Sequence, residues 1–248
     1  MDVPRSHPRY LSLLAREKLS EGYERGLVVL QGLTAQGRAE AFDYILGEKT
    51  IPPALKAEKA VAAHLVLAAN PVISVNGNVA VLTPKEVVQL SNVVQAKIEV
   101  NLFYRTAERV RKVVEHLKMA GAKNVLGTKP DTRIPGLDSK RALCSRHGIY
   151  SADVVLVPLE DGDRTESLAR MGKTVLAIDL NPMSRTSLAA SVTVVDELTR
   201  AMPNIIKSAR NLKKNRSLAV RTVKSFDNEK NLKAVHDHLY KRLKKLSS

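Results

Sequence analysis

Four short runs of apolar, mostly β-branched residues constrain the fold of this chain most strongly. They cover residues 72–75, 154–157, 175–178 and 192–195. Because these runs do not alternate regularly between apolar and polar side chains, they are typical of strands buried on both faces. Stretches with helical periodicity separate most of them. The pattern therefore predicts the α/β fold class: a Rossmann-like, mostly parallel sheet with helices on both faces.

The other segments complete this expectation. Two weaker strands are predicted over residues 97–102 and 124–126. Helices are predicted over residues 10–23, 39–46, 53–69, 83–94, 106–120, 163–172 and from residue 197 onward. A helical amino-terminal part is thus expected to precede the sheet, and a helical tail to follow it.

The chain divides into a large body and a basic end. Residues 205–248 contain thirteen Lys or Arg and three acidic residues, so they carry +10 of the net charge of +15. We expect one α/β domain over residues 1–204, mainly helical in 1–70 and sheet-forming in 71–204. Residues 205–248 are expected to form a basic helical C-terminal extension.

The basic extension leaves open an alternative function, that of a basic nucleic-acid-binding protein with an α/β scaffold. The chain has no Trp, three Phe and six Tyr, so few side chains could stack on bases. The extension also has an apolar stripe, formed by Leu232, Val235, Leu239, Leu243 and Leu246. Such a stripe predicts a helix that packs on the body or on a second subunit, with its lysines facing outward.

The single cysteine, Cys144, excludes a disulfide framework and a cysteine-rich zinc site. A chain without disulfides suits the reducing cytoplasm, where we expect it. Its apolar stretches are far shorter than a membrane span, and no apolar signal core follows the amino terminus. Membrane insertion and secretion are therefore not expected. The histidines show no metal-ligand spacing, so no metal ligand is assigned.

Polar residues are dense directly after the predicted strands. In open parallel sheets, ligands bind beyond the carboxyl ends of the strands, where these residues would line one cleft. The candidates for ligand binding at these positions are Asn76, Asn78, Asn101, Tyr104, Arg105, Asp161, Asp163, Asp179, Asn181, Arg185 and Thr186.

Each candidate also has a purely structural interpretation. Arg38 could pair with Glu40 at a helix start, and Asp179 could only cap the following turn. Residues 185–186 could be an ordinary first helical turn. Residues 76–78, with the sequence Asn-Gly-Asn, could be a tight turn that needs left-handed backbone angles.

Standard nucleotide-binding motifs are missing. There is no Gly-x-Gly-x-x-Gly fingerprint, which disfavours a second alternative, a dinucleotide-dependent dehydrogenase. Residues 121–129 come closest to a phosphate-binding loop, but five residues separate the two glycines, and Thr128 precedes Lys129 instead of following it. A nucleotide bound by this chain would therefore be held by an unusual arrangement.

Several longer strings, in this order, resemble those of the archaeal 4-phosphopantoate–β-alanine ligases, also called phosphopantothenate synthetases. The resemblance covers roughly residues 5 to 203. The strings that carry it are residues 6–10, 37–47, 70–78, 96–106, 133–137, 148–153, 157–165, 177–182 and 184–186.

The resemblance implies a reaction: ATP, 4-phosphopantoate and β-alanine give 4′-phosphopantothenate, AMP and diphosphate, through an acyl-adenylate, on the route to coenzyme A. It also implies a Mg²⁺ requirement and a homodimer, with small molecules rather than nucleic acid as partners. Because both ATP and phosphopantoate are multiply anionic, such a cleft needs arginines or lysines. The absence of a nucleophilic triad fits a mechanism based on positioning and electrostatics.

The resemblance also implies residue roles. It places ATP on Arg16, Arg38, Asp179, Leu180, Asn181, Arg185, Thr186, Glu197 and Leu198. Glu197 departs from the residue expected there, and its side chain is tolerated if the position contacts adenine through its backbone. The substrate-binding residues are expected to be Asn76, Asn78, Tyr104, Asp161 and Asp163. The two aspartates would serve Mg²⁺ or the ammonium group of β-alanine, and Asn101 and Arg105 are expected to be catalytic.

Overall fold

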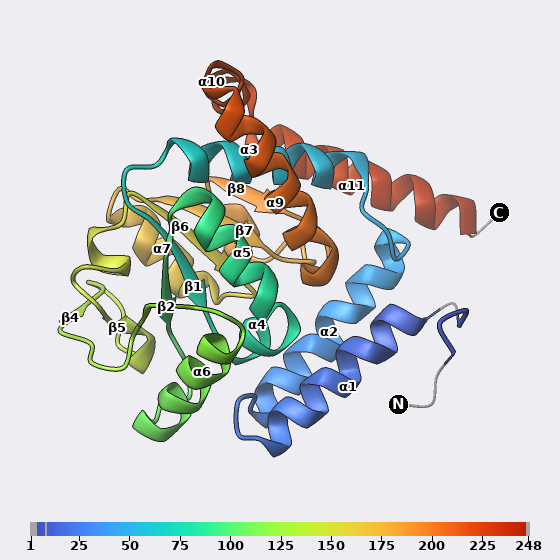
Figure 1. Cartoon of the computed structure of the whole chain (residues 1–248). Helices are drawn as coiled ribbons and strands as arrows, with labels where there is room; N and C mark the ends of the chain where they lie inside the picture. The colour runs from blue at the N-terminus through green and yellow to red at the C-terminus, as the bar shows by residue number, and fades with distance from the viewer. Residues whose placement is uncertain (1–3, 8, 247–248) are drawn as a thin grey trace.

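A six-stranded sheet, parallel throughout, forms the centre of the molecule (Figure 1). The computed structural model describes residues 4–7 and 9–246. The strands follow the order β3-β2-β1-β6-β7-β8, so the chain reverses its direction of progress between β1 and β6. Their bounds are β1 Pro71–Val75, β2 Lys97–Val100, β3 Val125–Leu126, β6 Val154–Pro158, β7 Thr174–Ile178 and β8 Val192–Val194.

Both faces of the sheet are buried, as the apolar runs predict. Along β1, Ile73 and Val75 belong to one apolar cluster, whereas Val72 belongs to a second cluster on the opposite face. Strand β6 is divided in the same way, with Leu156 on the first face and Val155 on the second. Because successive side chains of these strands enter apolar clusters on opposite faces of the sheet, apolar residues follow one another along the strand instead of alternating with polar ones. The predicted α/β fold class is confirmed.

Helices cover the first face densely. They are α3 (Pro52–Leu67), α4 (Gly77–Leu82), α5 (Pro84–Val94), α6 (Ala107–Met119) and α9 (Leu198–Lys214). The second face is covered by α7 (Gly162–Arg170), by the short helix α8 (Arg185–Ala189) and by a small antiparallel hairpin. The hairpin consists of β4 (Thr132–Arg133) and β5 (Leu143–Cys144) and is joined to the 3₁₀ helices η1 (Lys140–Ala142) and η2 (Ile149–Ser151).

Two amino-terminal helices, α1 (Tyr10–Glu24) and α2 (Leu30–Leu46), lie beside the sheet (Figure 1). The prediction that the second helix begins at residue 39 is wrong, because α2 begins at Leu30 and contains two glycines. Gly32 cannot be replaced by a residue with a side chain without a clash, since an added Cβ would lie 2.5 Å from Oδ1 of Asn78. Asn78 Nδ2 also donates to the Gly32 carbonyl oxygen at 2.9 Å.

Residues 76–78 do not form the tight turn that their sequence allows. Asn76 instead caps α4, and its side chain accepts a hydrogen bond from the Val79 amide at 3.1 Å. Gly77 and Asn78 are the first residues of that helix. The turn interpretation is wrong because the same residue type that favours a turn also caps a helix.

The basic end of the chain is helical, and α9 runs without interruption across residue 204. It is followed by α10 (Arg216–Ser225) and α11 (Asn228–Leu246). Leu232 and Val235 are buried against Leu46 and Ile51, so the prediction that α11 packs on the body is confirmed. The lysines predicted to face outward are exposed, namely Lys230, Lys233, Lys241, Lys244 and Lys245.

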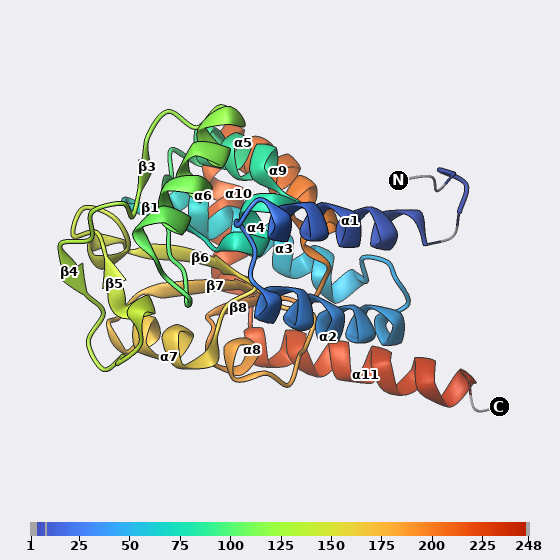
Figure 2. The ribbon, with the colours of Figure 1, turned by 90° about the horizontal axis from the view of Figure 1, so that it is seen from below.

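The far end of α11 extends beyond the sheet, on the side opposite the β4–β5 hairpin (Figures 1 and 2). In both views α2 lies between α1 and α11. Leu243 and Leu246, the last two residues of the predicted stripe, are exposed there. Across the described part of the chain, no helix combines the length and the apolarity needed to cross a bilayer.

Candidate active site

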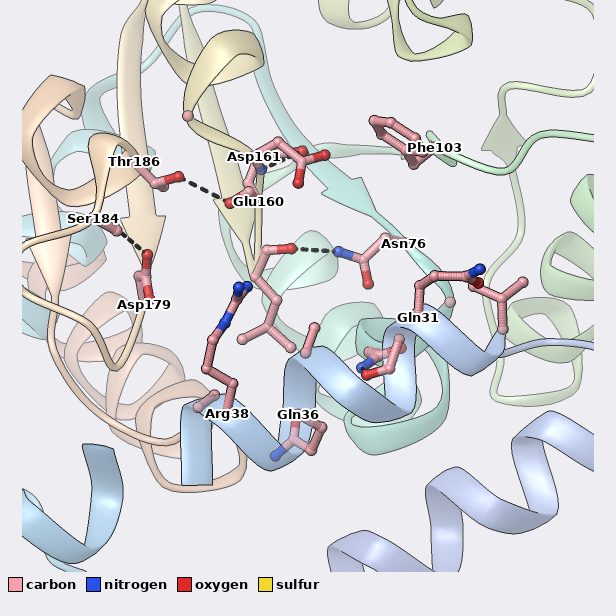
Figure 3. Close-up of a pocket in the computed structure, with 18 of the residues that line it drawn as sticks. Gln31, Gln36, Arg38, Asn76, Phe103, Glu160, Asp161, Asp179, Ser184 and Thr186 are labelled. Carbon is pink, nitrogen blue, oxygen red and sulfur yellow. Dashed lines mark hydrogen bonds between the residues drawn. The ribbon is translucent and has the colours of Figure 1, made fainter. Parts of the chain in front are cut away.

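A pocket of about 560 Å³ opens at the carboxyl ends of β1, β2, β6 and β7, with α2 along its side (Figure 3). We call it the main pocket. Its lining includes Gln31, Gln36, Arg38, Asn76, Gly77, Asn78, Phe103, Tyr104, Arg109, Arg141, Glu160, Asp161, Asp179, Asn181, Ser184, Arg185 and Thr186. Because the strand order reverses between β1 and β6, the pocket occupies the position where ligands bind in doubly wound sheets.

Asn76 joins the two strands at this reversal point. Its side-chain nitrogen donates to the carbonyl oxygens of Pro158 at 3.2 Å and Leu159 at 2.9 Å, while its oxygen caps α4. Leu159 has a φ of 52°, in the left-handed region that side chains other than glycine rarely adopt. The backbone is therefore held in an unusual shape at the floor of the pocket.

Arg38 reaches from α2 toward the loops that follow β6 and β7 (Figure 3). Asp179, at the end of β7, accepts a hydrogen bond from the Ser184 hydroxyl and another from the Asn181 amide at 2.9 Å. Burial raises the pKa of Asp179, and these hydrogen bonds oppose that rise. Asp179 thus stabilises the following turn, as one interpretation predicts, and also lines the pocket.

Glu40 does not pair with Arg38, so that structural interpretation of Arg38 is wrong. Glu40 instead binds Arg16, whose Nε lies 2.8 Å from Oε2, and it accepts hydrogen bonds from Arg9 and Tyr44. Burial alone would raise the pKa of Glu40, but hydrogen bonds from Arg16, Ser12 and Tyr44, led by the one from Arg16, lower it to about 2. Among the described residues, Arg38 forms no ion pair and is available to an anion in the pocket.

Arg185 and Thr186 form the first turn of α8, directly against the start of α7. An added Cβ at Gly162 would lie 2.4 Å from the Arg185 Cβ, so only glycine allows this approach. Thr186 Oγ1 donates to the Glu160 carbonyl oxygen at 2.9 Å. The Arg185 side chain is largely exposed and pairs with Glu166, with 3.0 Å between Nε and Oε1.

A buried ionic network in and below the pocket contains Asp161, which was a predicted site residue, and the two arginines Arg141 and Arg164, which were not. Arg164 is fully buried and binds Glu160 and, at 3.2 Å, the Ser74 hydroxyl. Arg141 is almost as buried and contacts both Glu160 and Asp161, with 3.1 Å between its Nε and Oδ2 of Asp161. Burial lowers the pKa of both guanidinium groups to about 10. The sequence places Glu160 and Arg164 directly after a predicted strand and four residues apart, but it gives no sign that Arg141 joins them.

A second pocket, of about 460 Å³, adjoins the main one. Gln36 lines both pockets, and Leu180 of the second follows Asp179 of the first. Its lining is Arg5, His7, Arg9, Tyr10, Leu11, Ser12, Ala15, Arg16, Gln36, Glu40, Asp43, Glu48, Leu180, Glu197, Thr199 and Arg200. Apart from Leu198, the residues predicted to bind ATP are thus divided between two neighbouring pockets, with Arg16, Leu180 and Glu197 in the second.

Glu197 uses its side chain to cap α9. Its Oε2 accepts a hydrogen bond from the Thr199 amide at 2.6 Å, and burial raises its pKa. Beside it, Arg200 binds Asp43 at 3.0 Å and also Asp196, which fixes α2 against the end of β8. Among the described residues, Oε1 of Glu197 is buried without a hydrogen-bond partner, so only one of the two carboxylate oxygens is used in the cap.

Four predicted residues lie outside the described lining of both pockets: Asn101, Arg105, Asp163 and Leu198. Asn101 is buried, and its Nδ2 donates to the carbonyl oxygens of Arg141 at 3.1 Å and Leu143 at 3.0 Å.

Arg105 is half-buried and donates to the Gly127 carbonyl oxygen. Leu198 lies in the core, and Asp163 is in the first turn of α7. The catalytic and binding roles of these residues stay predictions, as do the roles of the pocket residues.

No preformed metal centre is found in the described part of the chain, since no three His, Cys, Asp or Glu side chains come together. Asp161 is more available than Glu160 in the main pocket, because its side chain is 47% exposed whereas that of Glu160 is 3% exposed, although Asp161 also pairs with Arg141. One or two carboxylates together with substrate phosphates are a typical environment for Mg²⁺. The residues present fit a metal that arrives with a phosphate ligand.

Comparison with known proteins identifies the relatives of this chain. The family model described as phosphopantothenate/pantothenate synthetase matches residues 53–242. The chain belongs to this family. A relative from Methanosarcina mazei is 52% identical over the whole chain and 98% of its own length. Relatives from Thermococcus onnurineus and Thermococcus kodakarensis are 51% and 50% identical, over 99% and 100% of this chain and 95% of each relative.

These three relatives are each named 4-phosphopantoate–β-alanine ligase. The matched region includes the sheet, both loops that follow β6 and β7, and most of the basic extension. Neither the family description nor these names refer to a nucleic-acid-binding protein, so the nucleic-acid alternative gains no support.

Proposed function

We propose that this chain is an ATP-dependent ligase that condenses 4-phosphopantoate with β-alanine to give 4′-phosphopantothenate, AMP and diphosphate, in coenzyme A biosynthesis. The observation that carries the proposal is the 50–52% identity to three ligases of that name over essentially the whole chain. The paired pockets at the strand ends support it, because they offer room for a nucleotide and an acid side by side.

ATP is assigned to the wall that the two pockets share. In this assignment the adenine lies in the second pocket, near Leu180 and the backbone of Glu197. The phosphates extend past residues 179–181 toward Arg38 and Arg185 in the main pocket. This arrangement is supported by the absence, within the described chain, of an ion-pair partner for Arg38.

Activation of the acid needs positioning more than a nucleophilic side chain. The carboxylate of phosphopantoate must approach the α-phosphate of ATP although both are anionic, and cationic side chains reduce that repulsion. Mg²⁺ bound to the phosphates would supply further positive charge, with Asp161 as its candidate protein ligand. The carboxylate attacks the α-phosphorus and displaces diphosphate, which gives the acyl-adenylate. The neutral amine of β-alanine then attacks the acyl carbon, loses a proton and displaces AMP, which forms the amide.

A homodimer is part of the same proposal. Large apolar side chains are exposed on neighbouring helices, namely Leu11, Tyr44, Ile45, Tyr240, Leu243 and Leu246. We propose that these side chains form part of the contact between the two subunits. Light scattering coupled to size exclusion should give twice the chain mass of 27.2 kDa.

The decisive experiment mixes the purified chain with ATP, Mg²⁺, β-alanine and either phosphopantoate or pantoate, and identifies the nucleotide product. AMP should form with phosphopantoate, since its phosphate provides a bidentate target for arginine. Equal turnover of pantoate would contradict the proposed substrate. Release of ADP would contradict the acyl-adenylate route and indicate an acyl phosphate.

A further inference from the structure

Arg109, on α6, is a cation of the main pocket without an acidic partner. It lines the pocket, and no carboxylate in the described structure lies within ion-pairing distance of it. Burial lowers the pKa of its guanidinium group, and no acidic neighbour compensates. By contrast, Arg141 is balanced by Glu160 and Asp161. An unbalanced, partly buried cation in a pocket is stabilised by an anionic ligand.

Backbone carbonyl groups hold Arg109 in a fixed orientation. Its Nε and Nη2 donate to the Leu27 carbonyl oxygen at 3.1 and 3.0 Å, and its Nη1 donates to that of Tyr104 at 2.9 Å. A guanidinium group has five N–H donors, so one N–H on each terminal nitrogen is left for a ligand. Two such donors match a phosphate group, which accepts paired hydrogen bonds from arginine.

Gly77 makes room for this arrangement. An added Cβ at Gly77 would lie 2.6 Å from Nη2 of Arg109 and 2.4 Å from the Leu27 carbonyl oxygen. The guanidinium group therefore lies directly against the start of α4, within the lining of the main pocket. Only glycine at position 77 lets the Arg109 guanidinium group come this close to the start of α4.

Arg109 marks the end of the pocket away from the residues assigned to ATP. It is bonded to Tyr104, whose neighbour Phe103 lies on the opposite side of the pocket from Asp179, with Asp161 between them (Figure 3). Arg109 and Arg141 both line this pocket. The pocket thus offers one cationic region beside Asp179 and another beside Tyr104.

We propose that Arg109 binds the phosphate group of the acid substrate and determines the preference for phosphopantoate over pantoate. The inference rests on the proposed function and adds a specificity-determining residue to it. With the phosphate beside Tyr104, the other end of the acid points along the pocket toward Asp161 and the ATP phosphates. The phosphate therefore positions the carboxyl group as well as adding affinity.

Titration calorimetry on Arg109→Met, with Arg111→Met as the matched control, tests this inference. Arg111 is an exposed arginine on the same helix, paired with Glu115 at 3.9 Å. We expect Arg109→Met to weaken phosphopantoate binding by about 30-fold, the size typical of a lost hydrogen bond to a charged group. Binding of ATP and of pantoate should change less than about threefold, and Arg109→Lys should restore part of the lost affinity.

The outcomes separate a specific role from a structural one. Arg109 also donates hydrogen bonds to two backbone carbonyl groups, so its role could be purely structural. In that case Arg109→Met would bind phosphopantoate, pantoate and ATP all more weakly, and this result would overturn the inference. A loss confined to ATP would assign Arg109 to the nucleotide phosphates instead. If the wild-type chain makes phosphopantothenate while Arg109→Met binds phosphopantoate normally, only this inference fails. If the wild-type chain neither binds phosphopantoate nor forms the product, the proposed function fails.

Discussion

The molecule has two concentrations of positive charge, and they are built in opposite ways. In and below the main pocket, Arg141 and Arg164 are buried, and both contact Glu160. On α11, the lysines are exposed, and the buried side chains of that helix are apolar ones such as Leu232 and Val235. In and below the pocket, ion pairs with Glu160 hold Arg141 and Arg164 in place, whereas the lysines of α11 extend into solvent.

This contrast shows why net charge is a poor guide to function here. Residues 205–248 supply +10 of the net +15, yet their structural contribution comes from the apolar stripe. The arginines of the pocket add little to the total, but desolvation and fixed hydrogen bonds make their interactions with an anion stronger. Changes in the pocket should therefore affect catalysis, and changes on α11 should affect stability.

The largest expected effect is on catalysis. Arg38→Ala and Arg185→Ala should each lower kcat/KM for ATP by about 30- to 1000-fold, if both side chains contact the ATP phosphates. The melting temperature should stay close to the wild-type value, because neither side chain is buried. Arg221→Ala, an exposed arginine on α10, is the matched control and should keep full activity. Steady-state kinetics and calorimetry measure both properties.

Unchanged activity in Arg185→Ala would exclude a phosphate contact there and leave only its pairing with Glu166. A large drop in melting temperature for either variant would indicate a structural role instead.

Removal of α11 should have the next largest effect, on folding. A chain ending at Lys224 loses the buried Leu232 and Val235, each worth about 1.5–3 kcal/mol on burial. It also loses Asn228, whose Oδ1 accepts a hydrogen bond from the edge-strand amide of Thr193 at 2.7 Å. Denaturant unfolding should therefore show a loss of at least about 3 kcal/mol, and the dimer should weaken.

A chain ending at Tyr240 is the comparison. It keeps the buried Leu232 and Val235 and should therefore keep most of the folding stability, whereas the loss of Leu243 and Leu246 should weaken the proposed dimer. If the chain ending at Lys224 kept its stability and its dimer but lost a tight, salt-sensitive affinity for RNA, the extension would be a nucleic-acid element.

The third prediction concerns Glu58, a buried carboxyl group on α3. Burial, with repulsion from Asp196, raises its pKa to about 8. A carboxyl group with a raised pKa stabilises the fold below its unfolded pKa, and this stabilisation is lost as the pH rises through the folded value. The wild type should therefore lose about 2 kcal/mol of unfolding free energy between pH 6 and pH 8 through this group.

Glu58→Gln should remove that part of the pH dependence, which pH-dependent denaturant unfolding would reveal. Glu24→Gln, at an exposed position, is the control and should keep the wild-type slope. An unchanged slope in Glu58→Gln would show that Glu58 is ionised in the folded protein.

The smallest effect is expected on the surface of α11. Replacing Lys233, Lys241 and Lys244 together with Ala should change the unfolding free energy by less than about 1 kcal/mol, because all three side chains are exposed. Ligase activity should stay at the wild-type value. A marked loss of activity would mean that the charge of the extension acts on the substrates, and the contrast between the two regions would no longer hold.

Much of the fold could be predicted from the sequence, because burial on both faces forces continuous apolar runs. Strand and helix positions followed from such runs and from helical periodicity. The glycine-containing first half of α2 could not be predicted, because Gly32 is matched to Asn78 of a different element. A glycine inside a helix is unfavourable by itself and is tolerated here because a neighbouring side chain needs the space. The role of Asn76 could not be predicted either, because asparagine favours both turns and helix caps.

By itself, the sequence determined the sheet, the apolar stripe of α11 and the set of polar residues that follow the strands. These properties are encoded locally, by periodicity and by the order of residues along the chain. Only the tertiary structure decided which arginine meets which anion. Arg16 rather than Arg38 binds Glu40, Arg141 and Arg164 share Glu160, and Arg109 keeps two donors for a ligand. Pairing between charges depends on distance and desolvation across elements far apart in the chain, which no local pattern records.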